Sequence, residues 1–556
     1  MLLTLLIWIY VTAITFLAGD ALLRLGRQLT GPLPVPAAPF VCLLGAAGLT
    51  VVLGWLWLVI PINVTTHLAV VGLLAGYAVW QRPKPVLALP RWKNQWLGWV
   101  AVGILFMAIW LRSVQLPRLA DTGGYHAPMI EWIYQYPVVP GLANLNYRFG
   151  FNNTWFLFTA LFRFQLTPDV PWHGLNGWMM VMLGWFSLTE WCRQPPTGPR
   201  LFSAWLGGWL ALGFLLIFHW TLSSPSPDLP THAYVVLCFW VWLRRAEADQ
   251  RSYADGWAWL LILLGMSALT TKLSAVTVLL LPALVVLQTL IRGNWRMLLL
   301  FGLTILVFTG YWLAGNVILS GYIAYPSLSP LVNWFSVDWK VPREVIATGL
   351  NNLQQGTRGD SNGILSLAWI PYWFRTRPVL EQGIFVLLMV APLPIFWYRK
   401  SMFSLIPGYG VALLITWIGV IFWFLLAPEI RFGAGNVLIT LGLCYGPVLS
   451  RAKWPMALPQ PVIAGLVGLI GLVLLVAAGR REPVGLVTPA GYPDGALRSY
   501  VVDSHLVVYP IDDSRVINGI RGYWGNCYDA TLPCSPYPIP GLRWRGQTPA
   551  NGFRTE

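Results

Sequence analysis

Long apolar runs alternate with short polar segments along most of the chain. Many of these runs reach the length of about 20 residues that an α-helix needs to cross a bilayer. We therefore predict an all-α polytopic membrane protein with about 13–14 transmembrane helices. The predicted helices cover residues 3–22, 37–60, 63–80, 95–112, 171–190, 201–219, 231–244, 256–270, 273–291, 297–319, 381–398, 404–426, 433–450 and 461–479.

The segments between and after these runs follow different patterns. Residues 126–136 predict an interfacial helix, and residues 149–164 are apolar but cannot form a full span in a consistent threading. The first apolar run lacks a basic start and a small-residue cleavage site, so we expect a retained helix instead of a signal peptide. The chain then divides into a transmembrane domain, 1–479, and a small, loop-rich tail, 480–556.

Composition supports the membrane assignment and changes how the charge is interpreted. Hydrophobic residues make up 56% of the chain and charged residues 10%, whereas a soluble domain carries about 25% charged residues. The net charge is +15. In a soluble protein such an excess would suggest nucleic acid, but here the basic residues bracket apolar runs, as in cytoplasmic loops. We expect no nucleic-acid partner.

The positions of the basic residues predict the orientation of the chain. Placing all of these clusters in the cytoplasm puts both termini outside. The polar segments 113–170, 220–231, 320–380 and 427–432 and the tail then share the outer face. The clusters comprise Arg24, Arg27, Arg82, Lys84, Arg91, Lys93, Arg193, Arg200, Arg244, Arg245, Arg251, Arg292, Arg296, Arg399, Lys400, Arg451 and Lys453.

The cysteines fall into two groups. One pair, Cys527 and Cys534, lies in the polar tail, where a disulfide is possible if the tail faces an oxidising compartment. The others lie in or beside apolar runs and are expected to be inert, buried residues: Cys42, Cys192, Cys238 and Cys444.

The first outer segment carries the most informative polar motif, ADTGGYH, with Asp121 and His126. The Gly123–Gly124 pair frees the backbone to turn. Either side chain suits a general base, or an anchor for a hydroxyl or a metal; the alternatives are a helix cap and a satisfied loop histidine. Because a loop carboxylate contributes little to helix packing, we expect Asp121 to matter for chemistry more than for folding. Glu131 lies on the interfacial helix as a candidate substrate contact or as part of a solvated face.

Three further charged residues follow in other outer segments. Asp228 lies in the proline-rich stretch SPSPDLP, where it could act as a second acid or cap the next helix. Lys272, at a tight outer turn, could bind a lipid phosphate or reach towards headgroups. Arg431, in APEIRF, could grip a phosphate through two N–H groups, or pair with Glu429.

Two tyrosines, Tyr322 and Tyr325, follow a predicted helix end in NVILSGYIAYPS. One interpretation is that they stack on the apolar face of a sugar. The alternative is the belt of aromatic residues that membrane proteins place at the interface.

Several of these motifs resemble a bacterial multi-spanning membrane family of unknown activity, often found in cyanobacteria. The resemblance rests on DTGGYHAPMIEWI, VPGLANLNYRFGFNNTWF, SPSPD, TKLS, NVILSGYIAYPS and APEIRF, and on CYDATLPCSPYPIPGLRWRG in the tail. That family in turn resembles the GT-C superfamily of membrane glycosyltransferases. The resemblance implies sugar transfer from a polyprenyl-phosphate donor on the outer face. Asp121 and Asp228 would then be the acids, and Lys272 and Arg431 the donor-phosphate contacts.

We therefore expect an inverting glycosyltransferase of the bacterial inner (cytoplasmic) membrane, with membrane lipid and a polyprenyl-phosphate-linked sugar as partners. Two alternatives stay open, a transporter of lipid-linked sugar or polysaccharide and a non-catalytic structural subunit. A divalent cation is an open question, and the sequence does not indicate an oligomeric state. Intramembrane charges lining a path would favour the transporter.

Overall fold

The fold is described from a computed structural model of the 556-residue chain. The structure describes residues 2–33, 36–85, 96–117, 119–167, 170–191, 213–247, 254–334, 336–359, 366–396, 408–451, parts of 465–476, 497–510, 516–517, 520–521, 527–528, 530–535 and 539–555.

The described part of the chain is mainly helical, and seven of its helices are long and apolar enough to cross a membrane. They comprise Leu2–Thr30 (α1), Ala38–Trp57 (α2), Val64–Gln81 (α3), Leu273–Ile291 (η4 and α11), Trp295–Ser320 (α12), Val379–Phe396 (which begins with α15) and Tyr409–Leu426 (α17). The chain is thus a polytopic α-helical membrane protein, as the apolar pattern predicts.

The remaining helices complete the bundle and its loops. They are α4 (Trp96–Ser113), η1 (Thr122–His126), α5 (Ala127–Gln135), η2 (Leu142–Asn144), η3 (Tyr147–Phe151), α6 (Trp155–Leu161), α7 (Leu175–Trp191), α9 (Asp228–Glu247), α10 (Ala254–Thr271), α13 (Arg343–Arg358), α14 (Ile370–Thr376), α18 (Ile430–Arg451) and η5 (Pro549–Asn551). Within two of the membrane-length helices, η4 covers Leu273–Leu279, α11 covers Leu280–Ile291 and α15 covers Val379–Val390.

Most predicted helices are found within a few residues of their expected ends, with three differences. Helix α1 continues to Thr30, well beyond its predicted end at residue 22. Helix α9 begins at Asp228 instead of residue 231, because Pro230 is tolerated in a first helical turn and an acid suits the helix N-terminus. Residues 273–279 form a 3₁₀ helix, where several β-branched side chains crowd the turn. The predicted helix 461–479 and much of 201–219 lie outside the described residues.

Two shorter predictions are confirmed. A helix is found over the predicted residues 126–136, as α5, and its residues 127–133 are buried within the protein; its interfacial position stays a prediction. The apolar segment 149–164 contains the end of η3 and the seven-residue helix α6, which is far too short to cross a bilayer.

Close packing of small residues joins the first two helices. A Cβ atom on Gly19 would lie 1.9 Å from the carbonyl oxygen of Val41, and one on Gly45 would lie 1.8 Å from that of Thr15. Helices without a hydrophobic driving force between them associate through such small residues. We infer that α1 and α2 form a tightly packed pair.

The tail contains short antiparallel hairpins, which the prediction of a loop-rich, all-α chain does not include. Strand β3 (Leu497–Val502) pairs with β4 (His505–Pro510), β5 (Val516–Ile517) with β6 (Ile520–Arg521), and β7 (Leu542–Trp544) with β8 (Phe553–Thr555). A further hairpin, β1 (Gln165–Thr167) with β2 (Val170–Pro171), precedes α7. The β3–β4 turn places Asp503 and Ser504 at φ 45° and 68°, as tight hairpin turns require.

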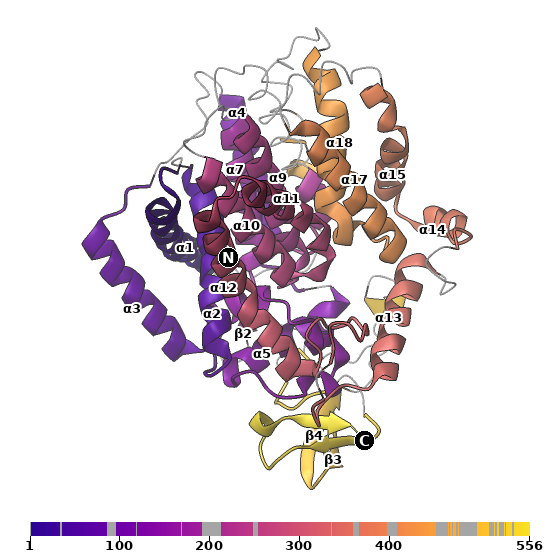
Figure 1. Cartoon of the computed structure of the whole chain (residues 1–556). Coiled ribbons are helices and arrows are strands. Elements are labelled where there is room, and N and C mark those ends of the chain that lie inside the picture. The colour runs from indigo at the N-terminus through magenta and orange to yellow at the C-terminus, as the bar shows by residue number, and fades with distance from the viewer. Residues whose placement is uncertain are drawn as a thin grey trace.

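The tail strands lie at the same end of the bundle as α5 and α13 (Figure 1). The backbone N–H of Phe553 donates to the carbonyl of Pro140 over 3.0 Å. The Thr555 hydroxyl donates to the side-chain oxygen of Asn144 over 2.9 Å, and Arg545 pairs with Asp338 at 2.9 Å. The C-terminal end is therefore attached to the loops at this end of the bundle.

Candidate functional site

The first acid of the site lies between α4, which ends at Ser113, and η1. Asp121 precedes η1, a π-helical turn over Thr122–His126 that continues into α5. Such turns are rare and recur at functional sites. The Gly123–Gly124 pair lies inside this turn, and neither residue adopts the left-handed conformation that a glycine turn would use. The widened helical turn, and not a loop, directs the chain here.

Two arginines hold the Asp121 carboxylate. Arg148 Nη1 lies 2.9 Å from Asp121 Oδ1, and Arg431 Nη1 lies 3.0 Å from Asp121 Oδ2. Arg148 comes from η3, and Arg431 from the first turn of α18. Sequence reasoning missed Arg148; the available signal was a single arginine in an otherwise aromatic outer segment.

The second acid, Asp228, is almost fully buried, with 3% of its side chain exposed. It forms an ion pair with Lys272, in the turn between α10 and η4. Its Oδ2 accepts a hydrogen bond from Ser226 over 3.1 Å and lies 3.6 Å from Arg431 Nη1. Asn176 in turn donates to the Ser226 carbonyl over 2.9 Å, so the short loop before α9 is held from two sides.

Arg431 joins the two acids and a third. Its Nε lies 2.6 Å from Glu429 Oε1, and its Nη1 reaches both Asp121 and Asp228. We call the resulting group the charge cluster; its members are Asp121, Arg148, Asp228, Lys272, Glu429 and Arg431. Three carboxylates face three cations, so the cluster is neutral as a whole when all are ionised.

Aromatic rings line the cations of the charge cluster. Lys272 Nζ lies 4.0 Å from the ring centre of Phe432, and the Arg431 guanidinium carbon lies 4.6 Å from it. The Arg148 guanidinium lies 5.5 Å from the ring of Tyr125. Cations over aromatic faces are stabilised even when they are desolvated, which keeps these charged groups in place between their acidic partners.

Burial and charge act in opposite directions on Asp121. Burial alone would raise its pKa, but the charges of Arg431 and Arg148 hold the pKa of this carboxyl well below its ordinary value. The carboxylate is therefore ionised and committed to its arginine partners in the free protein.

His126 is a neutral imidazole at physiological pH. Only 1% of the residue is exposed, and burial lowers its pKa to about 3. Its Nδ1 lies 3.5 Å from the Ser224 hydroxyl, which is 2.7 Å from the Thr122 hydroxyl. A short polar chain therefore connects His126 to the residue next to Asp121.

The pKa of His126 predicts a pH-dependent stability. Between pH 6.5 and about 3 the unfolded chain binds a proton that the folded chain does not, so the free energy of unfolding should fall as pH decreases through this range. The loss from His126 is about 2 kcal/mol at pH 5. Asp121 adds to it below the ordinary carboxyl pKa, because its folded form stays ionised. Unfolding of the detergent-solubilised chain at pH 7 and pH 5 measures the difference. His126→Gln should flatten the slope, and an unchanged slope would contradict this account.

The structure gives three other candidate residues internal partners away from the charge cluster. Glu131 pairs with Arg163 at 2.5 Å. The Tyr322 hydroxyl donates to the Val341 carbonyl over 2.9 Å, and the Tyr325 hydroxyl to the Tyr147 carbonyl over 2.7 Å. Both tyrosines are buried. The roles of Glu131, Tyr322 and Tyr325 as substrate contacts stay predictions, because the polar groups of these side chains already bind internal partners.

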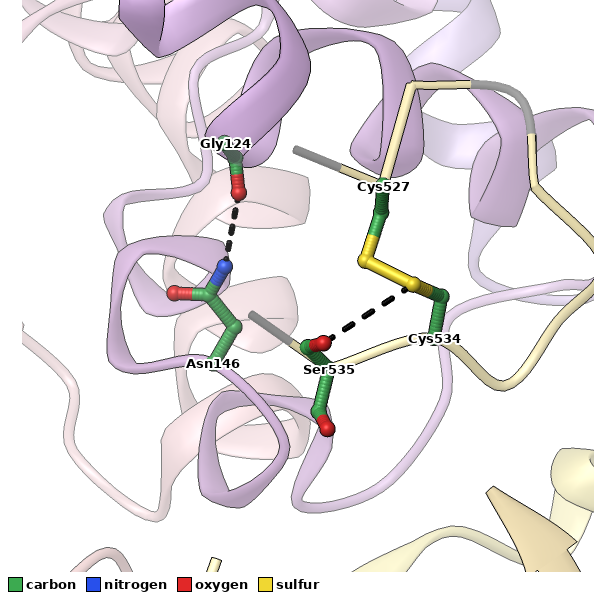
Figure 2. The surroundings of a disulfide bond; sticks show 5 residues. All are labelled: Gly124, Asn146, Cys527, Cys534 and Ser535. Atoms are coloured by element: carbon green, nitrogen blue, oxygen red, sulfur yellow. Dashed lines mark hydrogen bonds between the residues drawn. A yellow bond between two sulfur atoms is a disulfide. The ribbon is translucent and has the colours of Figure 1, made fainter. Parts of the chain in front are cut away.

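The tail reaches the site through its disulfide loop. Cys527 and Cys534 are bridged, with their Cα atoms 6.0 Å apart, so the possible disulfide is present. Next to the bridge, the Tyr528 N–H donates to the Gly123 carbonyl over 3.2 Å. Figure 2 shows the disulfide facing the Gly124–Asn146 hydrogen bond, which is 3.0 Å long. Buried free thiols at Cys42, Cys238 and Cys444 match expectation; Cys192 lies outside the described residues.

Opening the disulfide should release the tail from η1. Closing a loop of this length stabilises the folded segment by about 2–3 kcal/mol. We expect Cys527→Ser with Cys534→Ser to speed hydrogen exchange at the Tyr528 amide and proteolysis of the tail. Exchange mass spectrometry with and without reductant measures this. Reductant should reproduce the effect in the wild type and should not change exchange in the double variant. Slow exchange in all samples would show that the disulfide does not hold the tail on η1.

A divalent cation has no evident set of ligands in this part of the molecule. Among the described residues, no group of three or more His, Cys, Asp and Glu side chains could hold a metal. Asp121 and Asp228 are instead paired with Arg148, Arg431 and Lys272.

The fold and the site define a polytopic helical membrane protein with a buried charge cluster at one end of its bundle. The chain belongs to the family named "domain of unknown function (DUF8201)", whose profile matches residues 1–438. No curated protein and no solved structure matches the chain. The matched region contains every member of the charge cluster, and the tail lies beyond it.

Proposed function

We propose that the protein is a GT-C-like membrane glycosyltransferase that takes a sugar from a polyprenyl-phosphate donor on the outer face. One observation supports this most: two acids from separate loops, Asp121 and Asp228, meet the two candidate phosphate contacts, Lys272 and Arg431. Buried ionisable residues of membrane proteins are costly to maintain and usually mark functional sites.

The outward orientation rests on two independent features. The loops that carry the basic clusters favour the cytoplasm. The loops that carry the charge cluster lie at the other ends of the helices and therefore on the outer face. A disulfide between Cys527 and Cys534 favours an oxidising compartment for the tail. Because Tyr528 contacts η1 directly, an outer tail brings the charge cluster to the outer face as well.

The donor phosphate would bind where carboxylates now hold the cations. A phosphate oxygen arriving at the site would replace the contact of Arg431 with Asp121, and Lys272 would bind it while still paired with Asp228. Arginine provides directional N–H groups for phosphate, and lysine a point charge. This exchange would free Asp121 from Arg431 and let its pKa rise towards a value suited to a base.

Sugar transfer would then proceed in one displacement. The acceptor hydroxyl oxygen attacks the anomeric carbon, and the bond from that carbon to the phosphate oxygen breaks. The electron pair leaves with the polyprenyl phosphate, whose charge Arg431 and Lys272 stabilise. Asp121 accepts the hydroxyl proton. Asp228 holds Lys272 in position, and His126 supports η1 through Ser224 and Thr122.

A non-catalytic role has one specific observation in its favour. Every charge in the cluster already has a partner, so the same residues could lock the outer loops together without binding a substrate. Breaking such a lock would affect stability alone, whereas the proposed site predicts a separate effect on transfer. A transporter would instead move the lipid-linked sugar unchanged.

The direct test of the proposal uses purified wild-type protein in lipid nanodiscs with a panel of polyprenyl-phosphate sugars. We expect release of polyprenyl phosphate and loss of the sugar from at least one donor. The matched control replaces the donor with the corresponding polyprenol. No turnover, together with movement of an intact donor across proteoliposomes, would support the transporter and contradict the proposal.

A further inference from the structure

Arg358 carries a buried charge that the described residues do not neutralise. It ends α13, and 1% of the residue is exposed. Its Nη2 donates to the Leu426 carbonyl over 3.3 Å, and its guanidinium carbon lies 5.4 Å from the ring centre of Trp369. Its Nε and Nη1 have no hydrogen-bond acceptor within the described part of the chain.

A second unused donor lies beside this guanidinium. Trp369 is 2% exposed, and its indole Nε1 also lacks an acceptor among the described residues. The neighbouring Trp373 shows the contrast, because its Nε1 donates to the Pro428 carbonyl over 2.8 Å. Trp369 is fixed by its packing on Phe424, with ring centres 5.0 Å apart. The guanidinium of Arg358 and the indole N–H of Trp369 therefore lie together among aromatic rings, at the end of α17.

Such a pair of donors requires an explanation. Buried polar groups in folded proteins nearly always have a partner, and a buried cation needs an anion. The Leu426 carbonyl satisfies only one nitrogen of the guanidinium. An anion with several acceptor oxygens would satisfy the remaining N–H groups of Arg358 and the indole N–H of Trp369 together.

The surroundings indicate how that anion reaches the site. Large apolar side chains near it in sequence are exposed: Leu367 by 57%, Tyr372 by 61% and Val379 by 83%. In a membrane protein such a surface faces lipid. The Leu426 carbonyl also lies just before Glu429 and Arg431 of the charge cluster, so the place is next to the candidate active site along the chain.

We propose that Arg358 and Trp369 bind the phosphate group of a lipid at this end of α17. The phosphate belongs either to a membrane phospholipid or to a polyprenyl phosphate, which present the same acceptor oxygens. The inference does not depend on sugar transfer, because it concerns binding at residues outside the charge cluster.

The test measures which lipids the purified full-length protein retains, by native mass spectrometry. The probes are phosphatidylglycerol against diacylglycerol, and a polyprenyl phosphate against the polyprenol. We expect retention of a phosphate-bearing lipid over its alcohol. Arg358→Gln should reduce it about 10–100-fold, as loss of a charged hydrogen bond does, and Trp369→Phe about 3–10-fold. Arg343→Gln, at the other end of α13, is the matched control and should change nothing. The lipid pair whose phosphate-bearing member is retained by the wild type and lost in Arg358→Gln identifies the source of the phosphate.

Two results would overturn the proposal. If Arg358→Gln lowers the melting temperature but retains lipid like the wild type, Arg358 only caps the end of α17. If the wild type shows no preference for a phosphate-bearing lipid over its alcohol, Arg358 and Trp369 do not form a phosphate site. Should Arg358→Gln fail to fold, Trp369→Phe carries the test, and unchanged lipid retention in that variant would refute the site.

Discussion

Replacing Arg431 with glutamine is expected to cause the largest loss of both stability and donor binding. This guanidinium contacts Glu429 at 2.6 Å, Asp121 at 3.0 Å and Asp228 at 3.6 Å. Removing it leaves acids with unbalanced charge in a buried setting, which costs about 3–5 kcal/mol. Loss of a charged contact to the donor phosphate should weaken binding about 10–100-fold.

A second substitution separates these two effects. In Arg431→Gln with Glu429→Gln, the unpaired acid is removed together with its partner, so much of the lost stability should return. Donor binding should not return, because the phosphate contact is still absent. Thermal unfolding and donor-titration assays on the single and double variants measure both quantities. Recovery of binding together with stability would show that Arg431 only holds the loops.

Replacing Asp121 with asparagine is expected to reduce the rate of transfer by about 10²–10⁴, the usual effect of removing a general base. Asparagine keeps the shape and can still accept one hydrogen bond from an arginine. It cannot take the proton of the acceptor hydroxyl. The loss should therefore fall on kcat, with KM for the donor changed little.

The structure also predicts a stability effect for Asp121→Asn. Because Asp121 is partly exposed and pairs with both Arg148 and Arg431, its neutralisation should cost about 1–3 kcal/mol, between the limits for surface and buried ion pairs. Asp338→Asn is the matched control, since that acid pairs with Arg545 in the loops at the tail end of the bundle and is half exposed. It should leave transfer unchanged. Full activity in Asp121→Asn would remove the catalytic role.

The ion pairs of Asp121 could not be predicted from the sequence, for a physical reason. A loop position suggests a solvated carboxylate, but the partners of this one lie 27 and 310 residues away in sequence. Local pattern carries no signal for such pairs. Lys272 and Asp228 could each be proposed as a site residue from their predicted outer positions. Their direct pairing could not, because they lie 44 residues apart and meet only through the packing of α9 on α10.

The helices were the most predictable part of the fold. An apolar run of membrane length has few other stable structures, because backbone polar groups in lipid must be satisfied within the segment. The turn at Thr122–His126 and the tail hairpins were not predictable in this way. A π-helical turn and a short strand pair are stabilised by contacts with distant segments, such as that from Tyr528 to Gly123.

A structure of the protein in lipid nanodiscs with a polyprenyl phosphate bound tests the central claim most directly. We predict that the phosphate lies within hydrogen-bond distance of Arg431 and Lys272, and that Asp121 no longer pairs with Arg431. A phosphate bound elsewhere, with every ion pair of the charge cluster intact, would contradict the assignment of this cluster as a sugar-transfer site.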